Sequence, residues 1–221
     1  MKILALEFSS PQRSAALVQR SHSPAEIVEY EAVESGAHSN KPFEMIEEVL
    51  RQSGIEREQV ERLAIGLGPG SYAGIRGSIA LAQGWQLGGE TPIQGVSSAE
   101  CVAAQAHAEG VTGGIAVVID AQRGEFYLAR YELTSGAWRE VEPLRLASAA
   151  KVSEREQHGD LLVGPEVQNW FPKGRTIFPR AATLGRLALD QTSFISGEDL
   201  QPIYLRTPNF VKAPPPRILL E

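Results

Sequence analysis

Two acidic residues of this sequence, Glu7 and Asp120, each follow a short apolar run and precede a polar turn. An acid at the carboxyl end of a strand can orient a metal ion or a water molecule, and it can also cap the turn that follows. Neither residue has basic or hydroxyl partners at a fixed spacing. Both interpretations therefore stay open, and no residue is predicted to be catalytic.

A second stretch that could bind a ligand or take part in a reaction is GLGPGSYAGIRGS, residues 66–78, which holds five glycines and a proline. It is not a Walker A loop, because no lysine lies between Lys41 and Lys151. It is not a nucleophile elbow, because Ser71 directly follows a glycine. The glycines form a loosened dinucleotide-binding fingerprint, but Pro69 removes one of the amides that would hold a pyrophosphate.

Two interpretations of this glycine-rich stretch remain. The amides of Gly70, Ser71 and Tyr72 would point outward at a helix N-terminus, where the helix dipole favours an anion or a nucleotide phosphate. Arg76, one turn into the helix, could add a full positive charge. Alternatively, the stretch is a tight turn whose glycines let a strand and a helix approach closely. Three glycines near helical spacing favour this packing interpretation: Gly74, Gly77 and Gly84.

Histidine and cysteine usage predicts no metal site within the chain. The four histidines are His22, His38, His107 and His158. No two are spaced as metal ligands on one helix, and no cysteine–histidine cluster accompanies them. The single cysteine, Cys101, lies among apolar residues of a predicted helix and is expected to be a small buried side chain rather than a nucleophile.

The elements that must position these residues begin with two similar hairpins. Residues 2–6 and 15–18 form one, and residues 114–131 contain the other, each with an acid at the end of its first strand. The repeated pattern indicates two similar α/β halves, with a chance recurrence as the alternative. The glycine-rich residues 110–114 predict the boundary, which gives an N-terminal domain of residues 1–110 and a C-terminal domain of residues 111–221.

Helix signals are clear between and after the hairpins. A helix capped by Ser39 or Asn40, with Pro42 in its first turn, ends before Gly54. A capping box at residues 97–100 opens another helix. The remaining expected helices span residues 73–87, 147–157 and 181–191, and the remaining strands span 63–67, 92–96, 138–146 and 161–163. Residues 213–216 are expected to be extended.

Composition narrows the class of protein. The chain has 221 residues with a formal net charge of −6, so it is not expected to bind nucleic acid on its own. No run approaches the roughly 18 to 20 apolar residues of a membrane span, and the N-terminus does not read as a secretory signal. One cysteine excludes an internal disulfide framework, and a cytoplasmic location is expected.

Several segments, taken together, resemble the TsaB (YeaZ) family of the bacterial threonylcarbamoyladenosine pathway. They are KILALEFSS, GAHSNKPFEMIEEVL, LAIGLGPGSYAGIRGSIALAQGWQLG, VVIDAQRGEFYLARY and PIYLR. These segments sample nearly the whole chain in the family's order, and GPGSYAGIR is the most specific of them. The resemblance implies an α/β, actin-like fold of the Hsp70 and sugar-kinase type, with two related halves.

The resemblance also implies a function. The expected role is a non-catalytic, cofactor-free subunit that binds the related enzyme TsaD and works with the ATPase TsaE. Their complex transfers threonylcarbamoyl from threonylcarbamoyl-AMP to the adenosine beside the anticodon, in tRNAs that read codons beginning with A. The chain would meet tRNA only through the complex. TsaD holds its metal with paired histidines, whereas this sequence has no H-x-x-x-H and His38 stands alone.

The family further implies a partner interface on the first two helices, which would meet the matching helices of TsaD or of a second copy. The residues expected to face the partner are Phe43, Ile46, Val49, Leu50, Ile75, Ile79 and Ala82. Alternatively, the same faces pack against the chain's own sheet. The sequence departs from the family at Glu7-Phe8, where Asp followed by Thr or Ser is usual, which weakens any role in nucleotide turnover. An independent phosphotransferase or peptidase is the competing function.

Overall fold

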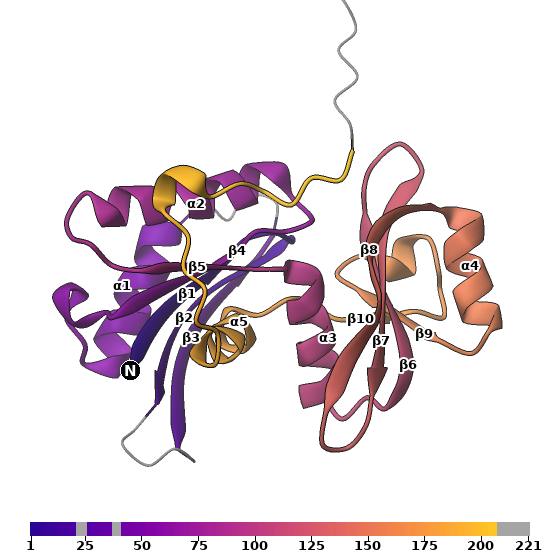
Figure 1. Cartoon of the computed structure of the whole chain (residues 1–221), viewed down its shortest axis with the longest axis horizontal. Helices are drawn as coiled ribbons and strands as arrows, with labels where there is room; N and C mark the ends of the chain where they lie inside the picture. The colour runs from indigo at the N-terminus through magenta and orange to yellow at the C-terminus, as the bar shows by residue number, and fades with distance from the viewer. Residues whose placement is uncertain (21–25, 37–40, 207–221) are drawn as a thin grey trace, which may run out of the picture.

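Two five-stranded sheets carry the fold of this computed structural model, which describes residues 1–20, 26–36 and 41–206 (Figure 1). The first sheet contains β1 (Lys2–Glu7), β2 (Gln12–Arg20), β3 (Ile27–Ser35), β4 (Arg62–Gly66) and β5 (Ile93–Val96). The second contains β6 (Gly113–Asp120), β7 (Glu125–Leu133), β8 (Trp138–Ser148), β9 (Leu161–Gly164) and β10 (Arg175–Thr176).

The two sheets have the same topology. Their strand orders are β3-β2-β1-β4-β5 and β8-β7-β6-β9-β10. In each, the first three strands are antiparallel neighbours and the last two run parallel to the first. The internal repeat predicted from the two hairpins is therefore confirmed, and the chain has two related halves.

Within the described residues, five α-helices accompany the strands, and all five were predicted. They are α1 (Pro42–Ser53), α2 (Tyr72–Gln86), α3 (Ser98–Ala108), α4 (Ala149–Gln157) and α5 (Ala181–Leu189), with short 3-10 turns η1 (Arg57–Gln59), η2 (Val167–Asn169) and η3 (Gly197–Asp199). Gly54 ends α1 in the left-handed conformation, and the Ser97 side chain caps α3. The proposed caps Ser39 and Asn40, and the segment 213–216, lie outside the described residues.

The two faces of the first sheet are covered by different helices. Leu4 and Leu6 of β1 face α1 and α2, in a core that also contains Val49 and Ile75. The alternate residues Ile3 and Ala5 face α5 on the other side, because successive side chains of a strand point to opposite faces. None of the helices in the described parts of the chain is both long enough and apolar enough to span a lipid bilayer.

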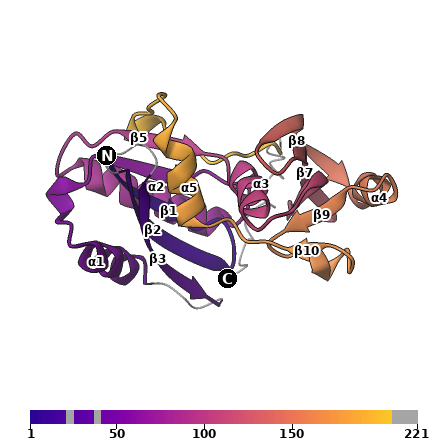
Figure 2. The same cartoon turned by 90° about the horizontal axis from the view of Figure 1, so that it is seen from below.

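The second sheet has a corresponding arrangement. Its β6 residues Val117 and Ile119 face α3, whereas the alternate residues Ala116 and Val118 face α4. As a result, α3 and α5 lie next to each other between the two sheets, with α1 at one end of the molecule and α4 at the other (Figures 1 and 2).

Two helices pack across the domain boundary that was predicted near residue 110. Helix α3 lies before the boundary and packs on the second sheet, whereas α5 lies after it and packs on the first. Each half therefore uses a helix that belongs, by chain order, to the other half. The reason is that a strand's apolar pattern does not specify which helix will cover it.

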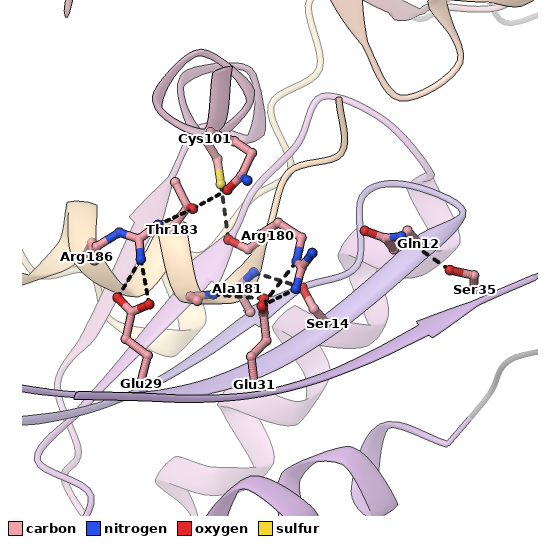
Figure 3. A network of polar contacts seen from close by, with 12 residues as sticks. Gln12, Ser14, Glu29, Glu31, Ser35, Cys101, Arg180, Ala181, Thr183 and Arg186 are labelled. Carbon is pink, nitrogen blue, oxygen red and sulfur yellow. Dashed lines mark hydrogen bonds and ion pairs between the residues drawn. The ribbon is translucent and has the colours of Figure 1, made fainter. Parts of the chain in front are cut away.

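Polar contacts hold α5 on the first sheet (Figure 3). The Arg180 guanidinium lies 2.5 Å from the Glu31 carboxylate, and the Arg186 guanidinium lies 2.6 Å from that of Glu29. The backbone amide of Ala181, which has no acceptor within its own helix, donates to Ser14 Oγ at 2.8 Å. A side chain of β2 therefore supplies the acceptor for the first turn of α5. These contacts belong to β3 and β2, which confirms that α5 is part of the first half.

Candidate functional site

Glu7 ends β1 inside the protein, where it has no solvent-exposed surface. Its Oε1 accepts a hydrogen bond from the Ser9 amide at 2.8 Å, and its Oε2 accepts one from Ser98 Oγ at 2.8 Å. Burial raises the pKa of the Glu7 carboxyl, and the hydrogen bonds from Ser9 and Ser98 oppose that rise. The carboxyl therefore joins β1 to the start of α3 and is closed off from bulk solvent.

Replacing Glu7 with glutamine is expected to alter how stability depends on pH. Because burial raises the Glu7 pKa, the folded chain holds this proton more tightly than the unfolded chain. Its contribution to stability is thus complete below the unfolded pKa near 4.5 and is lost as pH rises through the folded pKa. Glu7→Gln has no carboxyl to lose this proton. Between the unfolded and the folded pKa of Glu7, the free energy of unfolding of the variant should therefore rise relative to that of the parent by up to about 1.4 kcal/mol per pH unit.

Urea unfolding of parent and variant between pH 4.5 and pH 8 measures this difference. Glu47→Gln, at an exposed position of α1, controls for the loss of one carboxylate. Stability curves that run parallel for the parent and Glu7→Gln would show that Glu7 does not titrate as the structure requires.

Asp120 occupies the equivalent position in the second half, and it caps its own turn. Its Oδ1 accepts from the Gln122 amide at 2.8 Å, and its Oδ2 accepts from Gln122 Nε2 at 2.8 Å. Glu7 likewise accepts from the amide two residues later, so the two acids share a turn-capping geometry. The backbones of Gln122 and Arg123 take φ values of +64° and +60°, in the left-handed region that side-chain-bearing residues rarely adopt.

The glycines of residues 66–78 let β1 and α2 come together. A Cβ on Gly70 would lie 2.1 Å from the Ser9 carbonyl oxygen, and one on Gly74 would lie 1.9 Å from the Phe8 carbonyl oxygen. Both distances are far below van der Waals contact. The packing interpretation of this stretch is confirmed for Gly70 and Gly74, which face the backbone that follows β1.

The Ser71 amide, which was predicted to point outward, is instead used inside the chain. That amide donates to the Ser9 carbonyl at 2.7 Å, and Ser71 Oγ caps α2 by accepting from the Gly74 amide. Arg76 lies over the Tyr72 ring, with its guanidinium carbon 5.4 Å from the ring centroid. Contact of Gly70, Ser71 or Arg76 with an anion or a nucleotide stays a prediction.

A cleft of about 1250 Å³ lies between the two halves. The first half contributes Ser9, Ser10, Arg13, Gly70, Ser71 and Tyr72, and the second contributes Asp120, Gln122, Arg123, Tyr127 and Glu166. Both turns that follow the acids, and the end of the glycine-rich stretch, therefore open onto this one space.

The remaining wall of the cleft is an extended segment, residues 201–206, which we call the strap. In Figure 1 it is the yellow chain that leaves η3 beside α2 and runs toward the second half. The strap contains the PIYLR motif, residues 202–206, which entered above only as part of the family resemblance. Its Arg206 contacts the turn between β6 and β7.

The predicted partner-interface residues separate into two groups. Phe43 is 67% exposed on α1, and Leu50 is half-buried. The other five pack into the core of the first half: Ile46, Val49, Ile75, Ile79 and Ala82. For these five the prediction of a partner contact is corrected, because their side chains are covered by the chain's own sheet.

The outward face of α2 is different from its buried face. One exposed stripe along it holds only small residues: Ala73, Gly77, Ala80 and Gly84. Larger exposed side chains flank this stripe, namely Tyr72, Arg76 and Gln83, and Leu87, just after the helix, is 91% exposed. A Cβ built on Gly77 or Gly84 would meet no atom within 4 Å. A stripe of small side chains on a helix lets another helix approach closely along that stripe.

Cys101 is buried and inert in this setting. Burial raises the pKa of its thiol well above the usual value, and the thiol donates to the Arg180 carbonyl at 3.3 Å. The prediction of a buried side chain is confirmed. His22 and His38 lie outside the described residues, and within residues 1–20, 26–36 and 41–206 no three His, Cys, Asp or Glu side chains form a group able to hold a metal ion.

Two contributors to the site escaped sequence reasoning. Ser98 was assigned only to a capping box, yet it donates to Glu7 and accepts from the Gly68 amide at 3.1 Å. Arg206 lies far along the chain from the turn that it contacts. A local pattern could not have revealed either contact, because both join segments that are distant in sequence.

A family model and two solved structures match this chain in sequence or in fold. Residues 31–207 match the family model described as "TsaD: tRNA N6-adenosine threonylcarbamoyltransferase". Two solved structures from Pseudomonas aeruginosa share the fold at 23% identity. One, called an uncharacterized protein with similarity to peptidase YEAZ, has a TM-score of 0.76 and covers 93% of this chain and 99% of its own. The other, called YeaZ, has a TM-score of 0.73 and covers 92% and 99%. The fold is thus the expected actin-like arrangement of two related halves.

Sequence identity to curated relatives identifies the family within this fold. The tRNA threonylcarbamoyladenosine biosynthesis protein TsaB of Escherichia coli is 30% identical over 186 residues, which cover 76% of this chain and 80% of the relative. The protein of the same name from Haemophilus influenzae is 28% identical over 225 residues, covering 93% and 94%. The chain belongs to the TsaB (YeaZ) family.

Proposed function

We propose that this chain is a non-catalytic scaffold subunit of the complex that makes threonylcarbamoyladenosine in tRNA, and that it binds and supports TsaD. The product would lie next to the anticodon in tRNAs that read codons beginning with A. Family membership supports the pathway. The observation that carries the scaffold role is the exposed stripe of small residues on α2, where a Cβ built on Gly77 or Gly84 would meet no other part of the described chain within 4 Å.

A helix–helix interface fits this surface. Helices α1 and α2 cover the same face of the first sheet, so their outward faces point the same way. Small residues on α2 let a partner helix come close, while exposed Phe43 and Leu87 supply apolar area. Of the residues first proposed for the interface, Phe43 and Leu50 keep that role, and the outward residues of α2 replace the buried ones.

The buried acid supports a role without turnover. Glu7 stands where an actin-like kinase would place an acid for its metal-bound nucleotide, but both of its carboxylate oxygens accept hydrogen bonds inside the protein. The alternative, an independent phosphotransferase or peptidase, predicts ATP hydrolysis or peptide cleavage by the lone chain with a divalent metal. Turnover that disappears in Glu7→Gln would overturn the scaffold proposal.

The other parts of the proposal follow from the same surface and from charge. TsaE would join through the complex, and a second copy of this chain would use the same helices when TsaD is absent. Because the net charge is −6, tRNA would be bound mainly by partners. The expected location is the cytoplasm, where tRNA is modified.

Changing Ala80 to arginine is expected to weaken the complex with TsaD at least about tenfold, or 1.4 kcal/mol. The long charged side chain would stand between the two helices, while the free chain keeps its stability because Ala80 is exposed. Light scattering and calorimetric titration with TsaD measure the stoichiometry and affinity. The matched control is Ala150→Arg, at an exposed position of α4 at the far end of the molecule.

Two results would contradict the proposal at different levels. If the parent chain and TsaD remain separate at micromolar concentration, the scaffold role fails. If a one-to-one complex forms and Ala80→Arg binds as tightly as the parent, the scaffold role stands and the α2 interface is wrong.

A further inference from the structure

The strap, residues 201–206, is anchored first on the N-terminal half. The Ile203 amide donates to the Leu67 carbonyl at 2.8 Å, just beyond the end of β4, and the Ile203 side chain packs against the core of that half. The ring of Tyr204 lies 6.5 Å from that of Tyr72, centroid to centroid, at the start of α2. The first part of the strap therefore moves with the first half.

The last residue of the strap is anchored on the C-terminal half. Arg206 Nη2 lies 3.0 Å from the carbonyl oxygens of Ala121 and Gln122, and 2.7 Å from the Glu125 carboxylate. The Arg206 side chain is only 17% exposed. Hydrogen bonds that involve a charged donor are stronger than neutral ones, so one side chain holds the whole turn between β6 and β7.

The strap spans a space that would otherwise be open. Five of its six residues line the cleft between the halves: Gln201, Pro202, Ile203, Tyr204 and Arg206. The chain also passes from one half to the other through α3 and again between β10 and α5, and these two helices pack together between the sheets. Two adjacent crossings can act as a hinge, whereas a contact away from them restricts rotation.

We propose that Arg206 is a latch that sets how far the cleft between the two halves opens. With the latch closed, the strap ties the end of β4 to the β6–β7 turn and holds one separation of the halves. With the latch released, the halves rotate about α3 and α5. The Glu125 partner is about half exposed, so water can reach the latch and compete for it. Relative motion is the default for two halves joined by limited contacts.

The test measures the separation of the halves directly. Spin labels are attached to Gln52→Cys on α1 and Gln157→Cys at the last residue of α4, both exposed positions at opposite ends of the molecule. Cys101 is buried and does not react with the label. In the parent, pulsed dipolar spectroscopy should give one narrow distance distribution. In Arg206→Gln the distribution should broaden, and the amides of residues 122–125 should exchange hydrogen at least about tenfold faster.

Controls separate the latch from general loss of stability. Arg123→Gln removes an exposed arginine from the same turn and should leave the distance distribution as in the parent. Glu125→Gln removes the carboxylate but leaves both carbonyl acceptors, so it should broaden the distribution less than Arg206→Gln. A parent-like distribution in Arg206→Gln would overturn the proposal. If Arg206→Gln does not fold, a parent-like distribution in Glu125→Gln would do so.

Discussion

Replacing Gly74 with alanine is expected to destabilise the chain by about 3 kcal/mol, whereas Gly77→Ala on the same helix is expected to stabilise it by about 0.5–1 kcal/mol. The new methyl group at position 74 would lie 1.9 Å from the Phe8 carbonyl oxygen, so α2 would have to move away from β1. At position 77 it would meet nothing within 4 Å, and only the higher helix propensity of alanine would remain.

Urea unfolding of the two variants measures this contrast, and each serves as the control for the other. The two substitutions have the same chemistry and the same helix, and they differ only in what lies opposite the glycine. Equal effects would mean that α2 does not approach β1 as closely as described. A loss of stability at Gly77 would mean that its face is covered in the free chain.

Ile79→Glu is expected to destabilise the free chain by about 4 kcal/mol or to unfold it, because it places a charge in the core beneath α2. Ile79 is 7% exposed and packs in the same core as Leu4 and Ile65. Ala80→Glu, one residue further along, is expected to change the free energy of unfolding by less than about 0.5 kcal/mol, because surface substitutions are usually tolerated.

Thermal and urea unfolding of both variants check this prediction before any binding is measured. A charge placed at Ile46 or Ile79 is therefore not a clean test of a partner interface. Either side chain is covered by its own sheet, so loss of a complex in such a variant would report unfolding. A folded Ile79→Glu chain with parent-like stability would restore the original interface.

Element types were predictable because their signals are local. Pro42 and Gly54 mark the ends of α1, and Ser97 caps α3. Two hairpins, each with an acidic residue at the end of its first strand, indicated the internal repeat. Strand β3 was missed, although its sequence alternates. Tyr30 and Ala32 face the α1 side, whereas Glu29 and Glu31 reach the arginines of α5. The acidic alternate positions concealed a strand whose second face is covered by ion pairs.

The site was predictable only in part, because its contacts join distant segments. The glycine-rich stretch showed that something approaches the backbone closely, but not that this is the chain just after β1. Apolar spacing on α1 and α2 located two buried stripes without saying whether a sheet or a partner covers them. The family resemblance favoured a partner protein as the cover of these stripes. The packing of Val49 and Ile75 shows that the chain's own sheet covers them.

The placement of α3 and α5 has a consequence for how the chain is made. As synthesis proceeds from the N-terminus, the first sheet is complete in strands once β5 has emerged, but one of its faces has no cover until residues 181–189 follow. Domains commonly fold one after another as they leave the ribosome. Here the N-terminal half instead waits for nearly the whole chain, with Ile3, Ala5 and Val18 unburied in the nascent polypeptide. That interval is when a molecular chaperone would be needed most.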